Sequence, residues 1–498
     1  MEKRKIQTPF DEPVLSLAFD TLKLNKQCLI FVNTKRSAEK TAEEIAKNVT
    51  AENPDLLTIA LDAKSALSSP THQCERLSFC LRKGIAFHHS GLAAKQREII
   101  EEKFKEGVVK IICCTPTLAY GLDLPAFRVI IKDLKRFGRQ GLAWIPVLDY
   151  LQQAGRAGRP KYDSRGEAIA IAQTDSEKEK IIDLYIHGEP EPIHSKLAVE
   201  PALRMYLLSL IATEMVSSKK EIFLFFEKTF WAHQYQDSSR LETIIERMLE
   251  LLEEWEFIRE NEEQYRATPL GNRVSQLYID PFTAFQMTEC LRRAASKTVD
   301  TFSFLQMISY TLEMRPLVKV KTKEFEEVQT QVASFHEVLI TEEPGPFDAE
   351  YDEFLDSFKT ALMLHEWMNE QTEEFLLENF SVRPGELQAK LDIAEWLLYT
   401  AQEMSTLMHF QSLHRHIAKA RFRIKYGAKE ELFALLRLEN IGRVRARKLF
   451  AQGIKDLGDV KKADIEVLAR LLGKGIAQSV KKQVGQPELL TKTLEGFT

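Results

Sequence analysis

Residues 28–49, CLIFVNTKRSAEKTAEEIAKNV, place an uninterrupted apolar run before a polar turn and a longer charged segment. The run at 28–32 indicates a strand buried on both faces, and residues 38–49 indicate the helix that follows it. Further apolar strands are expected at 85–87, 109–113, 128–131 and 168–171, with a helix over 93–105. This alternation predicts a parallel sheet covered by helices on both faces, whose ligands bind beyond the carboxyl ends of the strands.

The strand alternation stops near residue 195, and the second half of the chain is predicted to be mainly helical. Helices are expected at 200–212, 219–229, 239–255, 282–295, 351–366, 385–401 and 429–437. Residues 257–259 and 265–268 flank a polar turn and are typical of a short hairpin. Helices followed by such a hairpin indicate a winged helix. Residues 340–350 contain two prolines and a glycine and are predicted to form a loop.

Composition limits the class of protein. The chain has 498 residues, of which 44% are hydrophobic and 28% charged, as in ordinary globular proteins of several domains. It has no apolar run of about 18 residues, and its N-terminus lacks the apolar stretch of a signal peptide. The six cysteines are scattered without the spacing of a zinc site or a disulfide framework. We therefore expect a cytoplasmic protein with reduced thiols, no metal site and no membrane contact.

Charge is distributed unevenly along the chain. The net charge is only -5, but residues 321–380 contain 16 Asp and Glu against 3 Lys and Arg, whereas residues 415–486 contain 18 Lys and Arg against 7 Asp and Glu. A basic end on an acidic body is typical of an appendage that binds a polyanion such as nucleic acid. The alternative is a charged, solvated helical surface without a ligand.

The segment QQAGRAGRP at 152–160 is the strongest local motif. Arg156 and Arg159 lie three positions apart, each after a glycine, and Gln152 introduces them. Guanidinium groups bind phosphate oxygens in a bidentate way and stay charged, as the transfer of a phosphoryl group requires. Alone, the motif is also compatible with an arginine-rich surface turn.

Two further motifs precede it, each after a predicted strand: TPTLAYGLDLPA at 115–126 and FHHSGL at 87–92. The order and spacing of the three motifs resemble the second RecA-like motor domain of superfamily 2 helicases. In that resemblance Gln152, Arg156 and Arg159 act on ATP, and Gly121 and Asp123 contribute to the nucleotide site. It also places His89, Thr115 and Thr117 at the nucleic acid, where hydroxyls and helix amides hold a phosphate. A metal pair at His88 and His89 is the alternative, but no third ligand is visible.

The resemblance is closest to the archaeal Hjm-type DNA helicases, which are related to the helicase half of polymerase theta. It covers nearly the whole chain and rests on RKGIAFHHSGL, CTPTLAYGLDLPA, GEPEPIHSKL, LGNRVSQLYIDP, AEWL and LENIGRVRARKLF. It implies a second RecA-like domain at 1–195, a winged helix at 196–285, a helical ratchet domain at 286–424 and a basic helix-hairpin-helix domain at 425–498. The glycine turn at 441–442 and the three arginines after it are expected to hold DNA phosphates irrespective of sequence: Arg443, Arg445 and Arg447.

The resemblance assigns two aromatic residues to mechanical roles. Trp396 is expected to stack on a base of the translocating strand, with a buried core position as the alternative. The family carries an arginine two turns before this tryptophan, whereas this chain has Ala389 and beside it Lys390, which is the candidate substitute. Residues 132–146 are expected to form the hairpin that splits the duplex, with Phe137 or Trp144 against the terminal base pair. A solvent-exposed turn without that role is the alternative.

An ATPase of this class also needs a phosphate-binding loop of the form GxxxxGK[ST] and an acidic pair that holds Mg²⁺. The 498 residues contain no such loop pattern, and no DExH-type sequence follows an apolar strand. The first RecA-like domain is therefore expected to be missing, so that ATP and Mg²⁺ bind only with a partner that carries the P-loop. Two hypotheses follow. The chain is the C-terminal part or subunit of a 3'-5' DNA helicase acting on single-stranded or forked DNA, or it is a non-catalytic module that binds such DNA. Retention of the two arginines favours the first.

Overall fold

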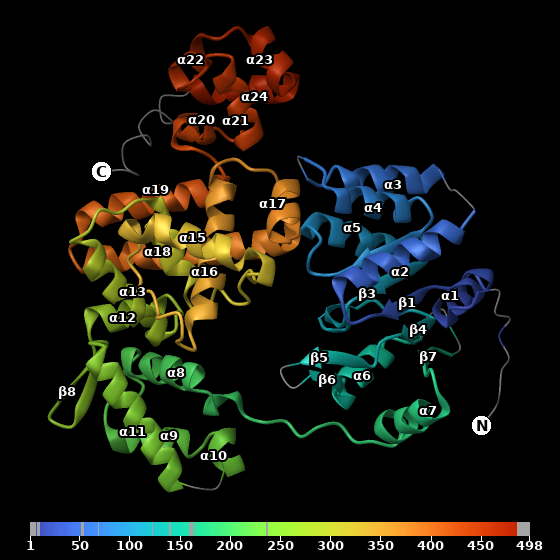
Figure 1. Ribbon diagram of the computed structural model, residues 1–498, viewed down its shortest axis with the longest axis horizontal. Helices are drawn as coiled ribbons and strands as arrows, with labels where there is room; N and C mark the ends of the chain where they lie inside the picture. Colours follow the sequence, from blue (N-terminus) through green and yellow to red (C-terminus); the bar gives the residue numbers. More distant parts are fainter. Residues whose placement is uncertain are drawn as a thin grey trace. The chain divides into compact units, whose positions relative to one another are not determined.

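The computed structural model describes residues 6, 10–50, 54–67, 69–121, 123–138, 141–158, 163, 165–235 and 238–485. The chain divides into two compact units (Figure 1). The first contains Met1–Pro192 and Glu373–Gln388, and the second contains Ile193–Thr372 and Ala389–Thr498. The first division lies close to the predicted boundary at 195. The return of Glu373–Gln388 to the first unit was not predicted.

The first unit is built on a five-stranded sheet, which confirms the predicted α/β RecA-like class. Its strands are β1 (Cys28–Phe31), β2 (Ile85–His88), β3 (Ile111–Cys114), β4 (Arg128–Ile131) and β7 (Glu167–Ala170). Their order is β2-β3-β1-β4-β7, and all neighbours are parallel. The first four strands are buried along their whole length, as their apolar sequences require.

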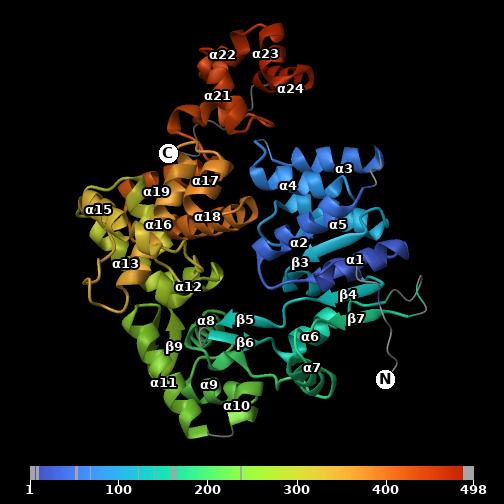
Figure 2. The same cartoon turned by 45° about the vertical axis from the view of Figure 1, so that its right-hand side comes forward.

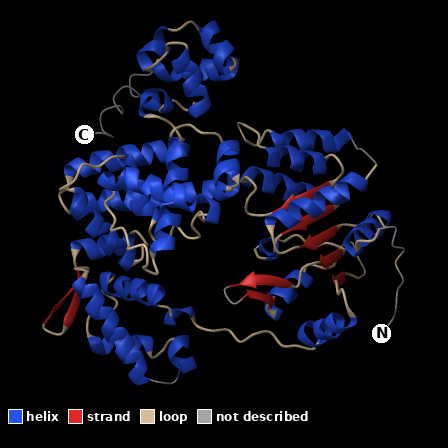
Figure 3. Cartoon of the chain, viewed as in Figure 1, coloured by secondary structure: helices blue, strands red, loops and turns tan. Residues whose placement is uncertain are grey.

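Helices lie on both sides of this sheet (Figure 3). They are α1 (Pro13–Lys23), α2 (Lys35–Asn48), α3 (Pro54–Lys64), α4 (His72–Leu81), α5 (Ala94–Lys105), α6 (Val147–Ala154) and α7 (Asp175–Ile181), followed by a π-helical turn (Ile182–Ile186). The helices α3 and α4 were not predicted. The unit also contains α17 (Glu373–Phe380) and the first turn of α18 (Pro384–Leu407).

The second unit begins with the predicted winged helix. Its helices are α8 (Glu200–Ala212), α9 (Lys219–Phe226), α10 (Phe230–Tyr235), α11 (Ser238–Glu254) and α12 (Pro269–Gln276). Between α11 and α12, β8 (Ile258–Asn261) and β9 (Gln264–Ala267) pair antiparallel and form the predicted hairpin (Figure 2). Glu262 and Glu263 at its tip both have positive φ, of 51° and 63°.

The rest of the second unit is helical, as predicted. It contains α13 (Pro281–Ala294), α14 (Thr301–Ser309), α15 (Phe325–Phe335), α16 (Tyr351–Met368), most of α18 and α19 (Gln411–Tyr426). The chain then forms α20 (Phe433–Leu436), α21 (Arg443–Ala451), α22 (Leu457–Lys462), α23 (Ile465–Leu472) and α24 (Lys474–Val484), which share a hydrophobic core of their own. This small terminal bundle occupies the position predicted for a helix-hairpin-helix domain.

Two features are absent from the described residues. In these parts of the chain no helix is both long and apolar enough to cross a membrane. Over the same residues no cluster of three or more His, Cys, Asp or Glu side chains is placed to hold a metal ion.

Candidate functional site

Two of the predicted motifs meet at the carboxyl edge of the sheet. Strands β2 and β3 are neighbours, with His88 opposite Cys114. Just beyond the strands, the Thr115 N–H donates to the carbonyl oxygen of His88 over 3.2 Å. The turns that follow the two strands therefore lie side by side where ligands of parallel sheets bind.

The arginine motif is joined to the second of these turns. The Arg156 guanidinium donates through Nε to the carbonyl oxygen of Ala119 (3.2 Å). The backbone beyond it pairs with Ala126, whose N–H donates to the Arg156 carbonyl (2.9 Å) and whose carbonyl accepts from the Gly158 N–H (2.6 Å). Gly158 has a φ of +97°, which favours glycine. The second predicted arginine, Arg159, lies outside the described residues.

The remaining residues assigned to the nucleotide lie at the surface of the same edge. The side chains of Gln152 and Asp123 are exposed. Gly121 has a φ of +77°, and a Cβ placed there would meet open space. Since its surroundings leave room for a side chain, its backbone conformation explains the glycine.

Thr115 and Thr117 form a hydroxyl pair at the start of a short 3-10 helix (Pro116–Ala119). Their Oγ1 atoms are 2.9 Å apart. Thr115 is nearly buried, whereas Thr117 is exposed. Of the two hydroxyls, that of Thr117 is therefore the one that the structure leaves accessible to a phosphate.

His89 differs from its prediction as a nucleic-acid contact. Its side chain is fully buried, so it does not reach a nucleic acid in this arrangement. Its Nδ1 accepts from the Gly91 N–H (3.2 Å), and its Nε2 lies 3.2 Å from Glu39 Oε1. Burial lowers the pKa of His89, so the ring stays neutral at neutral pH and, because Nδ1 accepts, carries its proton on Nε2, toward the carboxylate.

Glu39 is the centre of a buried ionic cluster that the sequence did not reveal. Its side chain, on α2, is 3% exposed and contacts Arg76 Nη1 (2.5 Å) and Arg383 Nε (3.1 Å) besides His89. Burial alone would raise the pKa of Glu39, but the contacts with His89 and Arg383 lower it to about 2. Glu39 therefore holds the β2 turn and the residue preceding α18 on one carboxylate.

The first turn of α18 lies directly on the β2 turn. The Gly385 N–H donates to the carbonyl oxygen of Gly91 (3.0 Å). A Cβ at Gly385 would overlap the carbonyl oxygens of Ser90 and Leu92. Only a glycine allows this approach of helix to turn, so the start of the predicted ratchet helix is fixed to the sheet domain.

The predicted hairpin at 132–146 is present as β5 (Lys135–Gly138) and β6 (Gly141–Trp144), which pair antiparallel. Phe137 is 84% exposed. Trp144 lies at the base of the hairpin, where Lys135 Nζ is 4.5 Å from its ring. Of the two aromatic residues predicted to meet a base pair, Phe137 is therefore the accessible one.

Trp396 lies on α18 and is half-buried. Its indole Nε1 donates to the carbonyl oxygen of Leu277 over 3.1 Å, next to the C-terminus of α12. The ring is thus held at one edge and keeps an accessible part. Lys390 is already engaged within the protein, because its ammonium donates to the carbonyl oxygens of Met314 (3.2 Å) and Pro316 (2.6 Å). This differs from its prediction as a DNA-binding cation.

Next to Trp396 lies a polar cluster that sequence reasoning missed. Arg273, from α12, donates through Nη2 to the Tyr399 hydroxyl (2.8 Å) and lies 2.8 Å from Glu403. The Arg421 guanidinium stacks 4.7 Å from the Tyr399 ring. Two signals pointed to it: Arg273 belongs to the segment LGNRVSQLYIDP, and Tyr399 follows Trp396 at the i+3 spacing of one helix face.

The three terminal arginines have different surroundings. Arg443 stacks 3.8 Å from the centre of the Trp367 ring and donates to the Gln371 carbonyl oxygen (3.0 Å). Arg447 pairs with Glu370 and with Glu431, and its pKa is raised chiefly by Glu370. Both therefore attach the terminal bundle to the end of α16, which differs from their predicted role in holding phosphates. Arg445 is exposed.

We expect Arg445→Ala to weaken DNA binding to every sequence alike and to lower the log-log salt slope by about one unit, as loss of one phosphate contact does. Arg447→Ala should instead lower the thermal stability, because it leaves Glu370 without its cation, and should change the slope less. Binding titrations at several salt concentrations measure both slopes. Equal losses of slope in the two variants would contradict the distinction.

Comparison with protein families identifies three matched regions. Residues 54–161 match the helicase conserved C-terminal domain, residues 166–259 match a helix-turn-helix domain, and residues 302–427 match domain 4 of archaeal helicases. The first contains the sheet edge with all three motifs, and the third contains Trp396.

The chain is also similar to curated proteins along nearly its whole length. It is 39% identical to the ATP-dependent DNA helicase Hel308 of Pyrococcus horikoshii, over 94% of this chain and 66% of the relative. It is 37% identical to that of Methanocella arvoryzae, over 97% and 66%, and 36% identical to that of Methanococcus vannielii, over 95% and 68%. The chain thus spans about two thirds of the length of these relatives.

Proposed function

The chain belongs to the Hel308 family of archaeal DNA helicases, and from this premise we propose that it supplies the second motor domain and the DNA-binding domains of an ATP-dependent 3'-5' DNA helicase. The observation that carries the proposal is Arg156, held against the carbonyl of Ala119 at the carboxyl edge of the sheet. A guanidinium fixed at this edge suits the charge that spreads over a transferring phosphoryl group. The substrate class is single-stranded or forked DNA.

The nucleotide would bind between this edge and a P-loop domain from outside these 498 residues. The sequence contains no GxxxxGK[ST] pattern, so the loop that holds the β- and γ-phosphates has to come from elsewhere. The acidic pair that holds Mg²⁺ in P-loop ATPases would come with it. This chain would contribute Arg156 and Arg159 in trans, with Gln152, Gly121 and Asp123 beside the nucleotide.

The test is an ATPase assay on the chain alone and on the chain mixed with a family P-loop domain. We expect no DNA-stimulated hydrolysis by the chain alone, because arginines without a phosphate-binding loop have no bound nucleotide to act on. Activity should appear on mixing. DNA-stimulated hydrolysis by the purified chain without a P-loop protein would contradict the proposal.

The alternative function is a non-catalytic module that binds single-stranded or forked DNA. The missing P-loop pattern favours it, whereas retention of Gln152, Arg156 and Arg159 favours the motor role, because DNA binding alone needs no arginines at a nucleotide edge. If the chain is only a DNA-binding module, adding a P-loop domain should leave its DNA affinity unchanged, and no mixture should hydrolyse ATP. The mixing assay therefore distinguishes the two functions.

For DNA binding we assign base stacking to Trp396. Trp396→Ala should weaken binding to single-stranded DNA by about 1 to 3 kcal/mol without changing the salt slope, because stacking releases no counterions. Trp396→Phe is the matched variant, since it keeps an aromatic ring and loses the hydrogen bond to the Leu277 carbonyl. If Trp396→Phe binds single-stranded DNA as weakly as Trp396→Ala does, the residue acts through that hydrogen bond and base stacking is excluded.

We also infer a cytoplasmic location. All six cysteines are free and buried, and burial raises the pKa values of Cys28, Cys80, Cys113 and Cys114. Buried protonated thiols are inert, and unpaired cysteines are typical of a reducing compartment.

A further inference from the structure

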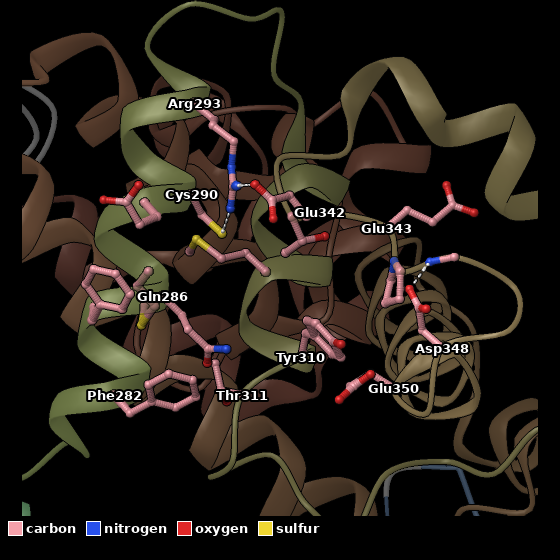
Figure 4. A pocket seen from close by; sticks show the side chains of 17 residues that line it. Phe282, Gln286, Cys290, Arg293, Tyr310, Thr311, Glu342, Glu343, Asp348 and Glu350 are labelled. Carbon is pink, nitrogen blue, oxygen red and sulfur yellow. Dashed lines mark hydrogen bonds and ion pairs between the residues drawn. The ribbon is translucent and has the colours of Figure 1, made fainter. Parts of the chain in front are cut away.

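A cavity of about 640 Å³ opens between α13, the end of α14 and the loop before α16 (Figure 4). It lies in the second unit, and none of its lining residues is assigned above to nucleotide or DNA. Its volume lies within the range of sites that bind a small molecule, so it also leaves room for a long side chain of another protein. The residues that define it are Phe282, Phe285, Met307 and Tyr310 on one side, and Glu342, Glu343, Asp348 and Glu350 on the other.

The helical side of the cavity is apolar, and packing inside the protein holds its side chains in place. Phe285 stacks on Trp255, with ring centres 5.5 Å apart. Tyr310 packs edge-on against Phe354 at 5.6 Å. Phe282 is 37% exposed at the mouth. Because Phe285 and Tyr310 pack on buried rings behind them, this wall exists before any ligand arrives.

The opposite side is acidic. Four carboxylates of the loop line the cavity, those of Glu342, Glu343, Asp348 and Glu350. Glu289 on α13 also lines it but pairs with Arg292 (2.5 Å), and Arg293 is the one cation among the lining residues. Arg293 is already engaged, since it donates to the Ile340 carbonyl (2.8 Å) and pairs with Glu342 (2.5 Å). The charge left for a ligand is therefore negative, within the acidic stretch 321–380.

The loop that carries these carboxylates is held in place. Asp348 accepts from the Gly345 N–H through Oδ2 (2.7 Å), and Arg293 fixes the start of the loop through Ile340. Figure 4 shows Tyr310 between the α13 side chains and the loop carboxylates Asp348 and Glu350. An aromatic ring next to carboxylates suits a ligand with an apolar stem and a cationic head.

We propose that this cavity binds an arginine or lysine side chain from a basic peptide segment of a partner protein. The stem would lie along Phe282 and Tyr310, and the guanidinium or ammonium would meet Glu343 and Glu350. DNA does not fit, because the carboxylates repel phosphates. A protein segment is favoured over a small cation because four carboxylates follow one another along the loop from Glu342 to Glu350, which suits more than one basic side chain of the same segment.

The probe is a labelled peptide that alternates leucine and arginine, titrated against the full chain at low salt by fluorescence anisotropy. Glu343→Lys with Glu350→Lys should weaken binding by about tenfold or more, because like charges then face the peptide. The matched control is Glu326→Lys with Glu327→Lys, the same change in charge at two exposed positions of α15 outside the cavity, which should alter binding little.

Two further measurements distinguish binding in the cavity from general electrostatic attraction of the peptide. Gln286→Trp, at a half-buried position that lines the cavity, should weaken binding by narrowing the space without changing its charge. A peptide with citrulline in place of arginine keeps the shape without the charge and should bind weakly. DNA affinity should stay unchanged in all variants, which keeps this test independent of the proposed helicase function.

The outcomes decide the proposal. Equal weakening by the cavity pair and the α15 pair would overturn it in favour of a diffuse charge effect. Equal binding of the citrulline peptide would exclude recognition of a cation. If spermidine displaces the peptide at an equal concentration of positive charge, the cavity binds a small polyamine, and the proposed protein partner is wrong.

Discussion

Arg156→Ala is expected to lower the kcat of ATP hydrolysis by about 10³-fold or more in the enzyme assembled with a P-loop domain, because arginine fingers contribute about that much to phosphoryl transfer. The guanidinium is held to the Ala119 carbonyl, so its position is set before the nucleotide binds. Arg156→Lys should not restore the rate, since an ammonium keeps the charge but cannot form the planar, bidentate contact. Steady-state ATPase assays with saturating DNA measure the effect.

Arg165 provides the matched control for Arg156. It lies nearby in the sequence, its side chain is 67% exposed, and its distance to Glu167 is 3.4 Å. Arg165→Ala should leave the rate close to that of the unmodified chain, because exposed pairs contribute little. Unfolding curves of both variants exclude a general loss of structure. If Arg156→Ala hydrolyses ATP as fast as Arg165→Ala, the arginine has no role in catalysis.

The sequence predicted the elements of the fold well because local patterns determine them. The buried strands CLIF and IICC are recognisable from composition alone, and the hairpins at 135–144 and 258–267 from their turns. The helix α3 was missed because its short, largely apolar sequence after Pro54 carries no clear apolar stripe at helical spacing. Its position depends on packing against α4, which only the tertiary structure supplies.

The surroundings of charged side chains were predicted less well. Arg128 begins a predicted strand, yet its fully buried guanidinium pairs with Asp20 (2.8 Å) and Glu167 (2.6 Å), which are remote in sequence. The sequence predicts Arg447 as a phosphate contact, whereas in the structure its guanidinium pairs with Glu370. A motif identifies a residue type suited to a ligand, but distant residues decide whether its charge is already neutralised.

Glu39 shows most clearly that the surroundings of a charged side chain cannot be predicted from sequence, because it is one of several glutamates on a polar helix. Glu39→Gln is expected to lower the free energy of unfolding by about 3 kcal/mol or more, since removing one partner of a buried ionic cluster leaves the others uncompensated. Arg383 and Arg76 would both lose their contact with a buried carboxylate. Glu43→Gln is the matched control one turn further along α2. The Glu43 side chain is 20% exposed and pairs with Arg76, so Glu43→Gln should lower the free energy of unfolding by less than Glu39→Gln.

The same cluster gives the stability of the first unit a defined dependence on pH. The pKa of Glu39 is lowered from 4.5 to about 2, so its contribution is present above pH 4.5 and is lost as the pH falls toward 2. The pKa of His89 is also lowered from its usual 6.5, chiefly by burial, so the unfolded chain takes up a proton first and acid destabilises the fold below about pH 6.5. Denaturant unfolding at a series of pH values should show a decline below pH 4.5 that is flatter in Glu39→Gln. Parallel curves for the two proteins would contradict the assignment.

Since Glu39 also holds Arg383 just before α18, a loosened cluster in the assembled enzyme should reduce unwinding more than ATP hydrolysis.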